Sequence, residues 1–211
     1  MIERAFGAEA RRRIEDAVRA AEAGNTGQIV PVVVLKSAGY PEARYRGALL
    51  AAALATLVVL ALDPSFRAVN LPLVQLGAGL LGGLVALLGP IERILAGRAE
   101  LDLATRERAL RAFYEHGLSH TAEGTGVLVF ASLFERRAVV LGDHGIHERT
   151  GEAVWRRAVG ALTSGLERGD PASGFCEAIA VCGEELTRHF PRPSGGGPGN
   201  ELPDGLRASD R

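Results

Sequence analysis

The sequence predicts an α/β domain that is interrupted by an apolar helical hairpin able to span a membrane. Between Gly47 and Gly89 only Asp63 and Arg67 carry a formal charge, whereas both flanks are dense in Arg and Glu. Outside this block, short apolar runs alternate with amphipathic helical patterns, which is typical of α/β domains. The 211 residues leave room for one ordinary domain and one additional element.

Two stretches form the predicted hairpin, residues 45–62 and residues 71–91. Each is close to the length that a helix needs to cross the hydrocarbon core of a bilayer. The turn between them, DPSFRAVN, is short, so the helices should be antiparallel neighbours. The alternative, two core helices of a soluble bundle, would need other amphipathic helices to cover them. Small residues recur at the spacing of helix contacts in membranes: Ala48/Ala52, Ala51/Ala55, Ala78/Gly82 and Gly79/Gly83.

Basic residues predict the orientation of the hairpin. The connecting loop holds only Arg67, whereas several basic residues precede and follow the two apolar stretches. The positive-inside rule places both flanks in the cytoplasm. We therefore expect an integral protein of the cell inner membrane whose soluble domain faces the cytoplasm, and the N-terminus lacks the apolar core of a signal peptide. The basic residues are Lys36, Arg44 and Arg46 before the hairpin, and Arg93, Arg98, Arg106 and Arg108 after it.

Several function classes receive no support. A formal net charge of −1 gives no nucleic-acid footprint. The sequence contains one GxGxxG motif, formed by Gly77, Gly79 and Gly82, with Glu100 downstream. The segment after it stays apolar and lacks the polar face of a dinucleotide-binding helix. Cys176 and Cys182 lie six residues apart, on different sides of one predicted helix, so we expect reduced thiols. GxSxG, HExxH and P-loop motifs are missing from the sequence.

The remaining elements alternate between helices and strands. A right-handed crossover from the first strand to the second makes these two parallel, and the LFERR turn makes the third antiparallel to the second. Pro31 in the first strand indicates an edge or a bulge. Asp170 and Pro171 are typical of a helix N-cap and first turn. The expected elements are helices 8–22, 105–118, 152–166 and one beginning at 171, and strands 28–36, 126–132 and 138–141.

The soluble part resembles the TPM domain family, named for thylakoid-lumen, photosystem-repair and receptor-associated members. The matching stretches are RIEDAVRAAEAGNTGQIVPVVV, GTGVLVFASLFERRAVVLGDHGI, the residues around Trp155, and GFCEAIAVCGEELTRHFP, and NELPD in the tail is similar to bacterial membrane-bound members. The resemblance implies a small α/β sandwich with a mostly parallel sheet flanked by helices. With it, residues 1–40 and 100–190 become the two parts of the domain on either side of the transmembrane hairpin, residues 45–91. The last residues, 191–211, are rich in Pro and Gly, and their composition predicts a disordered tail.

The strand plan brings polar residues to one rim of the predicted sheet. An oxygen-rich rim with acidic residues could hold Ca²⁺ or Mg²⁺; alternatively, Asp143 caps a turn and its neighbours are solvated. Many members of the family carry Glu where this chain has Gln28, which weakens a hard-cation site. His116 and His120, four residues apart at one helix end, form a second possible metal pair. The rim consists of Thr26, Gln28, Glu123, Thr125, Asp143 and His144, of which Asp143, Glu123, Gln28 and Thr125 are the expected metal ligands.

The leading functional expectation is a non-catalytic one. The resemblance implies a membrane-anchored TPM-like domain that binds or stabilises membrane protein complexes. Its expected partners are the lipid bilayer and a membrane protein complex, or a second copy bound through the transmembrane helices. The alternative is a metal-dependent acid phosphatase that acts near the membrane, although a di-metal phosphatase needs more clustered carboxylates than this rim offers.

Overall fold

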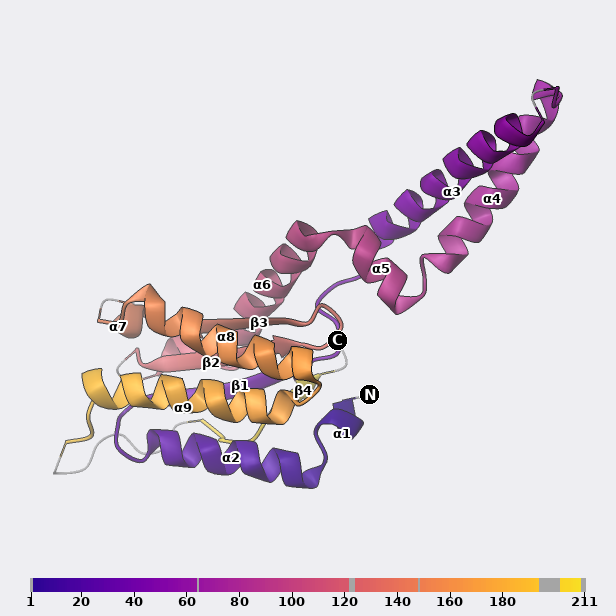
Figure 1. The fold of residues 1–211 in the computed structure, drawn as a ribbon. Helices are drawn as coiled ribbons and strands as arrows, with labels where there is room; N and C mark the ends of the chain where they lie inside the picture. Colours follow the sequence, from indigo (N-terminus) through magenta and orange to yellow (C-terminus); the bar gives the residue numbers. More distant parts are fainter. Residues whose placement is uncertain (1, 64, 122–123, 148, 194–201, 210–211) are drawn as a thin grey trace. The chain divides into compact units, whose positions relative to one another are not determined.

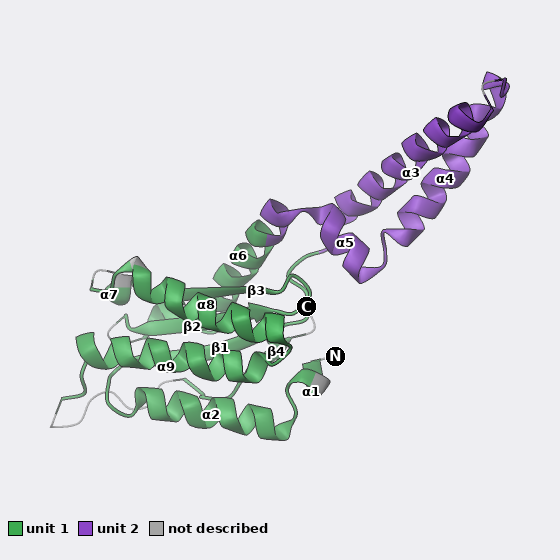
Figure 2. Cartoon of the chain, in the orientation of Figure 1, with its two compact units in different colours: residues 1–38, 102–211 green, residues 39–101 purple. Residues whose placement is uncertain are grey.

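The computed structural model describes residues 2–63, 65–121, 124–147, 149–193 and 202–209. The chain forms two compact units, one made of residues 1–38 and 102–211 and the other of residues 39–101 (Figure 2). The second unit is thus inserted into the first. The predicted hairpin limits, residues 45–91, lie inside this second unit, which is longer at both ends.

The larger unit contains a four-stranded mixed sheet in the order β3-β2-β1-β4. Strand β1 pairs in parallel with β2 and β4, and β2 pairs antiparallel with β3, which confirms the predicted directions of the first three strands. The strands are β1 (Gln28–Val34), β2 (Gly126–Ser132), β3 (Arg137–Gly142) and β4 (Arg207–Ser209).

Helices cover both faces of this sheet, as Figure 1 shows. One core holds Ile29 and Val33 of β1 with side chains of α2, α8 and α9. The other holds Val30 and Val32 with side chains of α6. Because alternate residues of a strand point to opposite faces, a strand buried on both sides needs a continuous apolar run such as QIVPVVV. The helices of this unit are α1 (Ile2–Ala5), α2 (Ala8–Glu22), α6 (Arg98–Glu115, which begins in the inserted unit), η2 (Leu118–His120), α7 (His144–His147), α8 (Glu152–Arg168) and α9 (Pro171–His189).

The outer edge of β1 explains how Pro31 fits inside the sheet. The register with β2 leaves the backbone groups of Ile29, Pro31 and Val33 facing away from β2. The N–H of Ile29 donates to the carboxyl of Glu22 over 2.6 Å, Pro31 has no N–H, and β4 pairs only with Val32 to Val34. Among the described residues, the first half of β1 is therefore an edge, as Pro31 indicated, and the second half is covered.

The C-terminal tail differs from the prediction. Residues 191–211 were expected to be disordered, but Arg207–Ser209 form β4, and Leu206 is buried in the core. Residues 194–201 and 210–211 of this prediction lie outside the described residues. Leu35 N donates to Ser209 O and extends this pairing. Composition alone misled here: the Pro/Gly-rich part precedes a short strand that β1 needs as a partner.

The inserted unit contains two helices that are long and apolar enough to cross a membrane, α3 and α4 together with the 3₁₀ turn before it. They run side by side (Figure 1). The second helix is shorter than the predicted 71–91, because Leu88 is extended and Pro90 lies in the first turn of a separate helix. The elements are α3 (Pro41–Leu62), η1 (Ala68–Asn70), α4 (Leu71–Val85) and α5 (Gly89–Ala96).

Both flanks of the insertion are held by the β2–β3 turn of the larger unit. Ser37 N donates to the Glu135 carboxylate over 2.9 Å, and Asp102 forms an ion pair with Arg137. Glu135 and Arg137 are two residues apart, so the two ends that the insertion separates meet at the same turn.

We predict that the larger unit folds without the insertion. Replacing residues 39–101 with a linker of about eight Gly and Ser residues should give a soluble domain that unfolds cooperatively in urea, because the linker has only to bridge the two ends at the β2–β3 turn. Circular dichroism during urea unfolding checks this. Aggregation in the absence of detergent would argue against an independent domain.

Glu22 predicts a pH dependence of stability. Burial raises the pKa of this carboxyl from 4.5 to about 7, against the opposing hydrogen bond from Ile29 N. The folded state therefore holds its proton up to about pH 7, while the unfolded chain loses it near pH 4.5. The free energy of unfolding should fall as the pH rises from 4.5 to 7, by at most about 3 kcal/mol, and change no further above it.

The substitution Glu22→Gln should remove this slope, since the amide oxygen still accepts from Ile29 N. Glu9→Gln, at an exposed position of the same helix, is the matched control and should keep the slope. Urea unfolding of the full chain in detergent at pH 4.5, 6 and 8 measures it. An equal slope in wild type and Glu22→Gln would contradict the assignment.

Candidate functional site

Three segments meet at the predicted rim. Gln28 of β1 is in register with Gly126 of β2, and Asp143 N donates to Gly126 O over 2.9 Å. The hydroxyl of Thr125 donates to the carbonyl of Thr26 over 3.1 Å. The structure therefore brings the starts of β1 and β2 and the end of β3 together, as the strand plan predicted.

Two of the expected metal ligands are engaged inside the protein. The side-chain oxygen of Gln28 accepts from Leu202 N over 3.0 Å, and its amide donates to Gly27 O. Thr125 and Gln28 are 1% and 3% exposed, respectively. Their side chains hold the chain segments of the rim to one another, and Gln28 in particular anchors the returning tail.

Asp143 is the predicted ligand that remains half-exposed. One of its carboxylate oxygens accepts from His144 N over 2.7 Å, so it caps the turn into α7. Gly124, at φ +63°, lies against this turn: a Cβ atom there would be 3.4 Å from Gly145 N and 3.7 Å from the other Asp143 oxygen. Both distances are ordinary van der Waals contacts, so the left-handed backbone rather than a lack of space favours glycine at this position. The capping role that sequence analysis left open for Asp143 is thus present.

The metal prediction stays a prediction. Glu123 lies outside the described residues, so the four expected ligands cannot be placed together. Among the residues that the structure does describe, no three His, Cys, Asp or Glu side chains group in a way that could hold a metal ion.

The histidine pair is not arranged as predicted. Helix α6 ends at Glu115, and Gly117 is left-handed, so His116 and His120 do not share a helix face. The Nδ1 of His120 lies 3.1 Å from the Ser119 hydroxyl. Burial lowers the pKa of His116, which favours its neutral form.

The loop between α2 and β1 contains the polar residues that sequence analysis missed. Asn25 is fully buried, and its side-chain amide donates to Ala21 O and to the Thr187 hydroxyl while its oxygen accepts from Gly27 N. Arg192 donates to the Asn25 carbonyl. The signal in the sequence was the Asn-Thr-Gly run that begins at Asn25, since an Asn side chain commonly accepts from the N–H two residues on.

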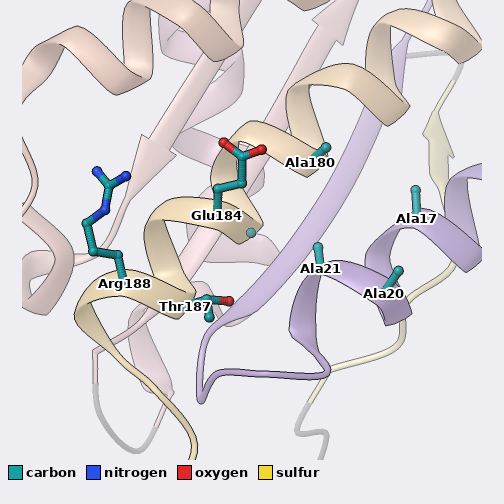
Figure 3. Close-up of a pocket in the computed structure, with 8 residues that line it drawn as sticks. Ala17, Ala20, Ala21, Ala180, Glu184, Thr187 and Arg188 are labelled. Carbon is teal, nitrogen blue, oxygen red and sulfur yellow. The ribbon is translucent and has the colours of Figure 1, made fainter.

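A surface groove lies between α2 and α9. It has a volume of about 640 Å³, and Figure 3 shows that alanines of α2 face Ala180 of α9, while Glu184 and Arg188 point away from them. The closeness of the helices comes from Gly183, where a Cβ would be 2.6 Å from Ala21 Cβ. The described lining residues include no histidine, cysteine or activated hydroxyl, so the groove offers no nucleophile and base pair. Its lining is Ala17, Ala20, Ala21, Ala180, Gly183, Glu184, Thr187 and Arg188.

The two cysteines are free, as predicted. Burial raises the pKa of the Cys182 thiol to about 12 and also raises that of Cys176. Both thiols are therefore protonated at neutral pH and poor nucleophiles.

The helical hairpin carries a second groove, of about 550 Å³, on one side of the α3–α4 contact. The helices touch at Gly47 and Gly82, where a Cβ on Gly82 would be 2.5 Å from Gly47 O. Gly79 has more space, because a Cβ there would be 3.6 Å from Ala48 O and 4.0 Å from Ala52 Cβ. The small residues thus divide into those that join α3 to α4 and those that line this open groove. The GxGxxG run lies inside α4 and forms no phosphate-binding loop.

One polar contact crosses the hairpin beside this groove. The Gln75 amide donates to the Thr56 hydroxyl over 3.0 Å, and that hydroxyl donates to Ala52 O. Such a contact satisfies polar groups in a segment that is otherwise apolar.

Comparison with known proteins gives a likeness of fold. No family model matches the chain, and no curated protein matches it. The NMR structure of BA42 protein from the psychrophilic bacterium Bizionia argentinensis is similar to this chain, with a TM-score of 0.59 and 18% sequence identity, over 96% of this chain and 94% of that one. At this identity the similarity describes the fold alone: a mixed α/β arrangement of a four-stranded sheet flanked by helices.

Proposed function

We propose that the chain is an integral protein of the cell inner membrane whose α/β domain, on the cytoplasmic side, binds or stabilises membrane protein complexes without catalysing a reaction. The observation that carries the proposal is the pair of apolar helices in the inserted unit. Most of the large apolar side chains of these helices are exposed: the buried residues of α3 are the small Ala43 and Gly47, and α4 has none. Contiguous exposure of this kind marks a lipid or protein contact in a folded chain.

The exposed side chains are large and aliphatic along both helices. Leu49, Leu57, Leu73 and Leu80 are each between 65% and 72% exposed. In water this exposure would favour aggregation, whereas in lipid it removes the same surface from water. The basic residues on both flanks and the single Arg67 in the loop support a cytoplasmic domain.

The open groove of the hairpin supports a protein partner in the membrane. Ala48, Ala52, Gly79 and Gly83 line it, so a helix from another chain can approach both backbones closely. The partner is a helix of a membrane protein complex or the hairpin of a second copy. The stretches that resemble the TPM family support the same class of function, and no contact among the described residues favours the phosphatase alternative over it.

Filling this groove should release the partner. Gly79→Leu places an isobutyl group into the groove, which should reduce partner recovery about tenfold when tagged protein is captured from detergent-solubilised membranes. Gly77→Leu is the matched control: a Cβ there meets no atom within 4 Å, so this leucine should face lipid and leave recovery unchanged. Quantitative mass spectrometry of the captured material measures both.

Two results would contradict the proposal. Wild-type protein that brings down no stoichiometric partner and no second copy would remove the basis for a binding function. Equal loss with Gly77→Leu and Gly79→Leu would mean that the groove is not the contact.

The predicted cation site has a separate test. If Asp143 binds Ca²⁺ or Mg²⁺, the affinity should be weak, with a dissociation constant on the order of 10⁻⁴ M or higher, because only Asp143 and Glu123 of the four expected ligands carry a charge. Asp143→Asn should abolish binding in titration calorimetry while the Asn oxygen still caps His144 N. Unchanged binding in this variant would place the site elsewhere, and no binding by wild type would refute the prediction.

A further inference from the structure

The two edges of the sheet are not alike. The β4 edge consists of a three-residue strand, whereas the opposite edge is β3, six residues long. Strand β3 pairs with β2 alone among the described strands. Its sequence, RAVVLG, combines β-branched residues with no proline, and the structure has a regular register with β2 along its whole length.

The register shows which backbone groups of β3 are available. Asp143 N donates to Gly126 O, and pairs two residues apart repeat this pattern in an antiparallel ladder. Val139 and Leu141 therefore bond to β2, and the N–H and C=O groups of Ala138, Val140 and Gly142 point away from the sheet. An uncovered row of such groups is a template for another strand, and natural sheets normally block it.

A hollow of about 300 Å³ follows this edge. It is lined by β3 from Arg137 to Leu141, by Asp102, Thr105 and Arg106 of α6, and by Val159 of α8. The edge is thus bordered by side chains of the flanking helices but is not closed by them.

The charges at the ends of β3 match a second copy of the same strand, although Arg137 also forms an ion pair with Asp102 of its own chain. In an antiparallel pair of two β3 strands centred on Val140, Ala138 lies opposite Gly142 of the other copy, and Arg137 opposite Asp143. These opposed residues lie on the same face of the extended sheet, where opposite charges stabilise the pairing. Shifting the register by one hydrogen-bonding step places Arg137 opposite Leu141 or Gly145, so the charges favour one alignment.

We propose that two copies of this chain associate through their β3 edges, antiparallel about a two-fold axis at Val140, to form one continuous eight-stranded sheet. The outward N–H and C=O groups of Ala138, Val140 and Gly142 then pair with the same groups of the other copy. The interface is isologous, as expected for a two-fold dimer. It uses no residue of the hairpin and is independent of the binding function proposed above.

A charge exchange tests both the contact and its register. The full chain in detergent should be dimeric by sedimentation, and Arg137→Asp or Asp143→Arg alone should raise the dimer dissociation constant about tenfold or more, because like charges then face each other. The double variant Arg137→Asp/Asp143→Arg should restore the dimer. Arg12→Asp, which changes the net charge equally at an exposed position of α2, should have no effect.

A second variant covers the case in which the charge reversals disturb the fold. Ala138→Pro removes one outward N–H and leaves the bonds from Val139 and Leu141 to β2 in place, so it should give a monomer that still unfolds cooperatively. A monomeric wild type would overturn the proposal, as would a dimer that survives Ala138→Pro and both single reversals. A double variant that stays monomeric would overturn the register centred on Val140. Persistence of the dimer in Gly79→Leu separates this contact from one made by the hairpin.

Discussion

Strand β1 imposes the constraint on which the rest of this structure depends: it is buried on both faces, so every backbone group along both edges needs a partner inside the protein. On one side β2 supplies a parallel ladder. On the other side the N–H of Ile29 donates to the carboxyl of Glu22, Pro31 has no N–H to satisfy, and Val32 to Val34 pair with the short strand β4. The tail therefore returns across the domain, and Gln28 and Asn25 hold its route by bonds to Leu202 and Arg192.

The same constraint explains why an apolar helical hairpin can interrupt the domain directly after β1. The strand is completed by β2 and β4, which come much later in the chain, so nothing in its pairing requires the next residues to stay nearby. The insertion leaves and re-enters at a turn that holds both ends, through Glu135 and Arg137. Within the hairpin, the contact between helices depends on Gly47 and Gly82, whose backbones approach too closely for any side chain.

Prediction from sequence succeeded where pattern and length decide the outcome. Local signals predicted the alternation of helices and strands and the cap at Asp170, which accepts from Ser173 N over 3.2 Å. The handedness of crossovers predicted the parallel pairing of β1 with β2. The failures concern residues whose structure depends on distant partners. The strand near the C-terminus was missed because its three residues are extended through pairing with β1, which is far away in the sequence. The meeting of the strand ends at the rim was predicted correctly, whereas no local pattern shows that the Gln28 oxygen accepts from Leu202 N, and its expected role as a ligand stays a prediction.

The outer edge of β1 and the edge at β3 differ in how their backbone N–H and C=O groups find hydrogen-bond partners. At β1 the chain adds a buried acid with a raised pKa, a proline and a returning tail to leave no long open edge. The backbone groups at the β3 edge need hydrogen-bond partners just as those of β1 do. Beside the outward groups of Ala138 and Val140, however, the structure has a hollow. Edge strands that stay exposed are commonly blocked by lysine or proline, whereas the middle of β3 carries valines. This composition fits an edge that pairs with another strand. In an antiparallel pair of two β3 strands, Arg137 of each copy faces Asp143 of the other. A second copy of this chain can therefore supply the strand that covers the edge, without a different protein.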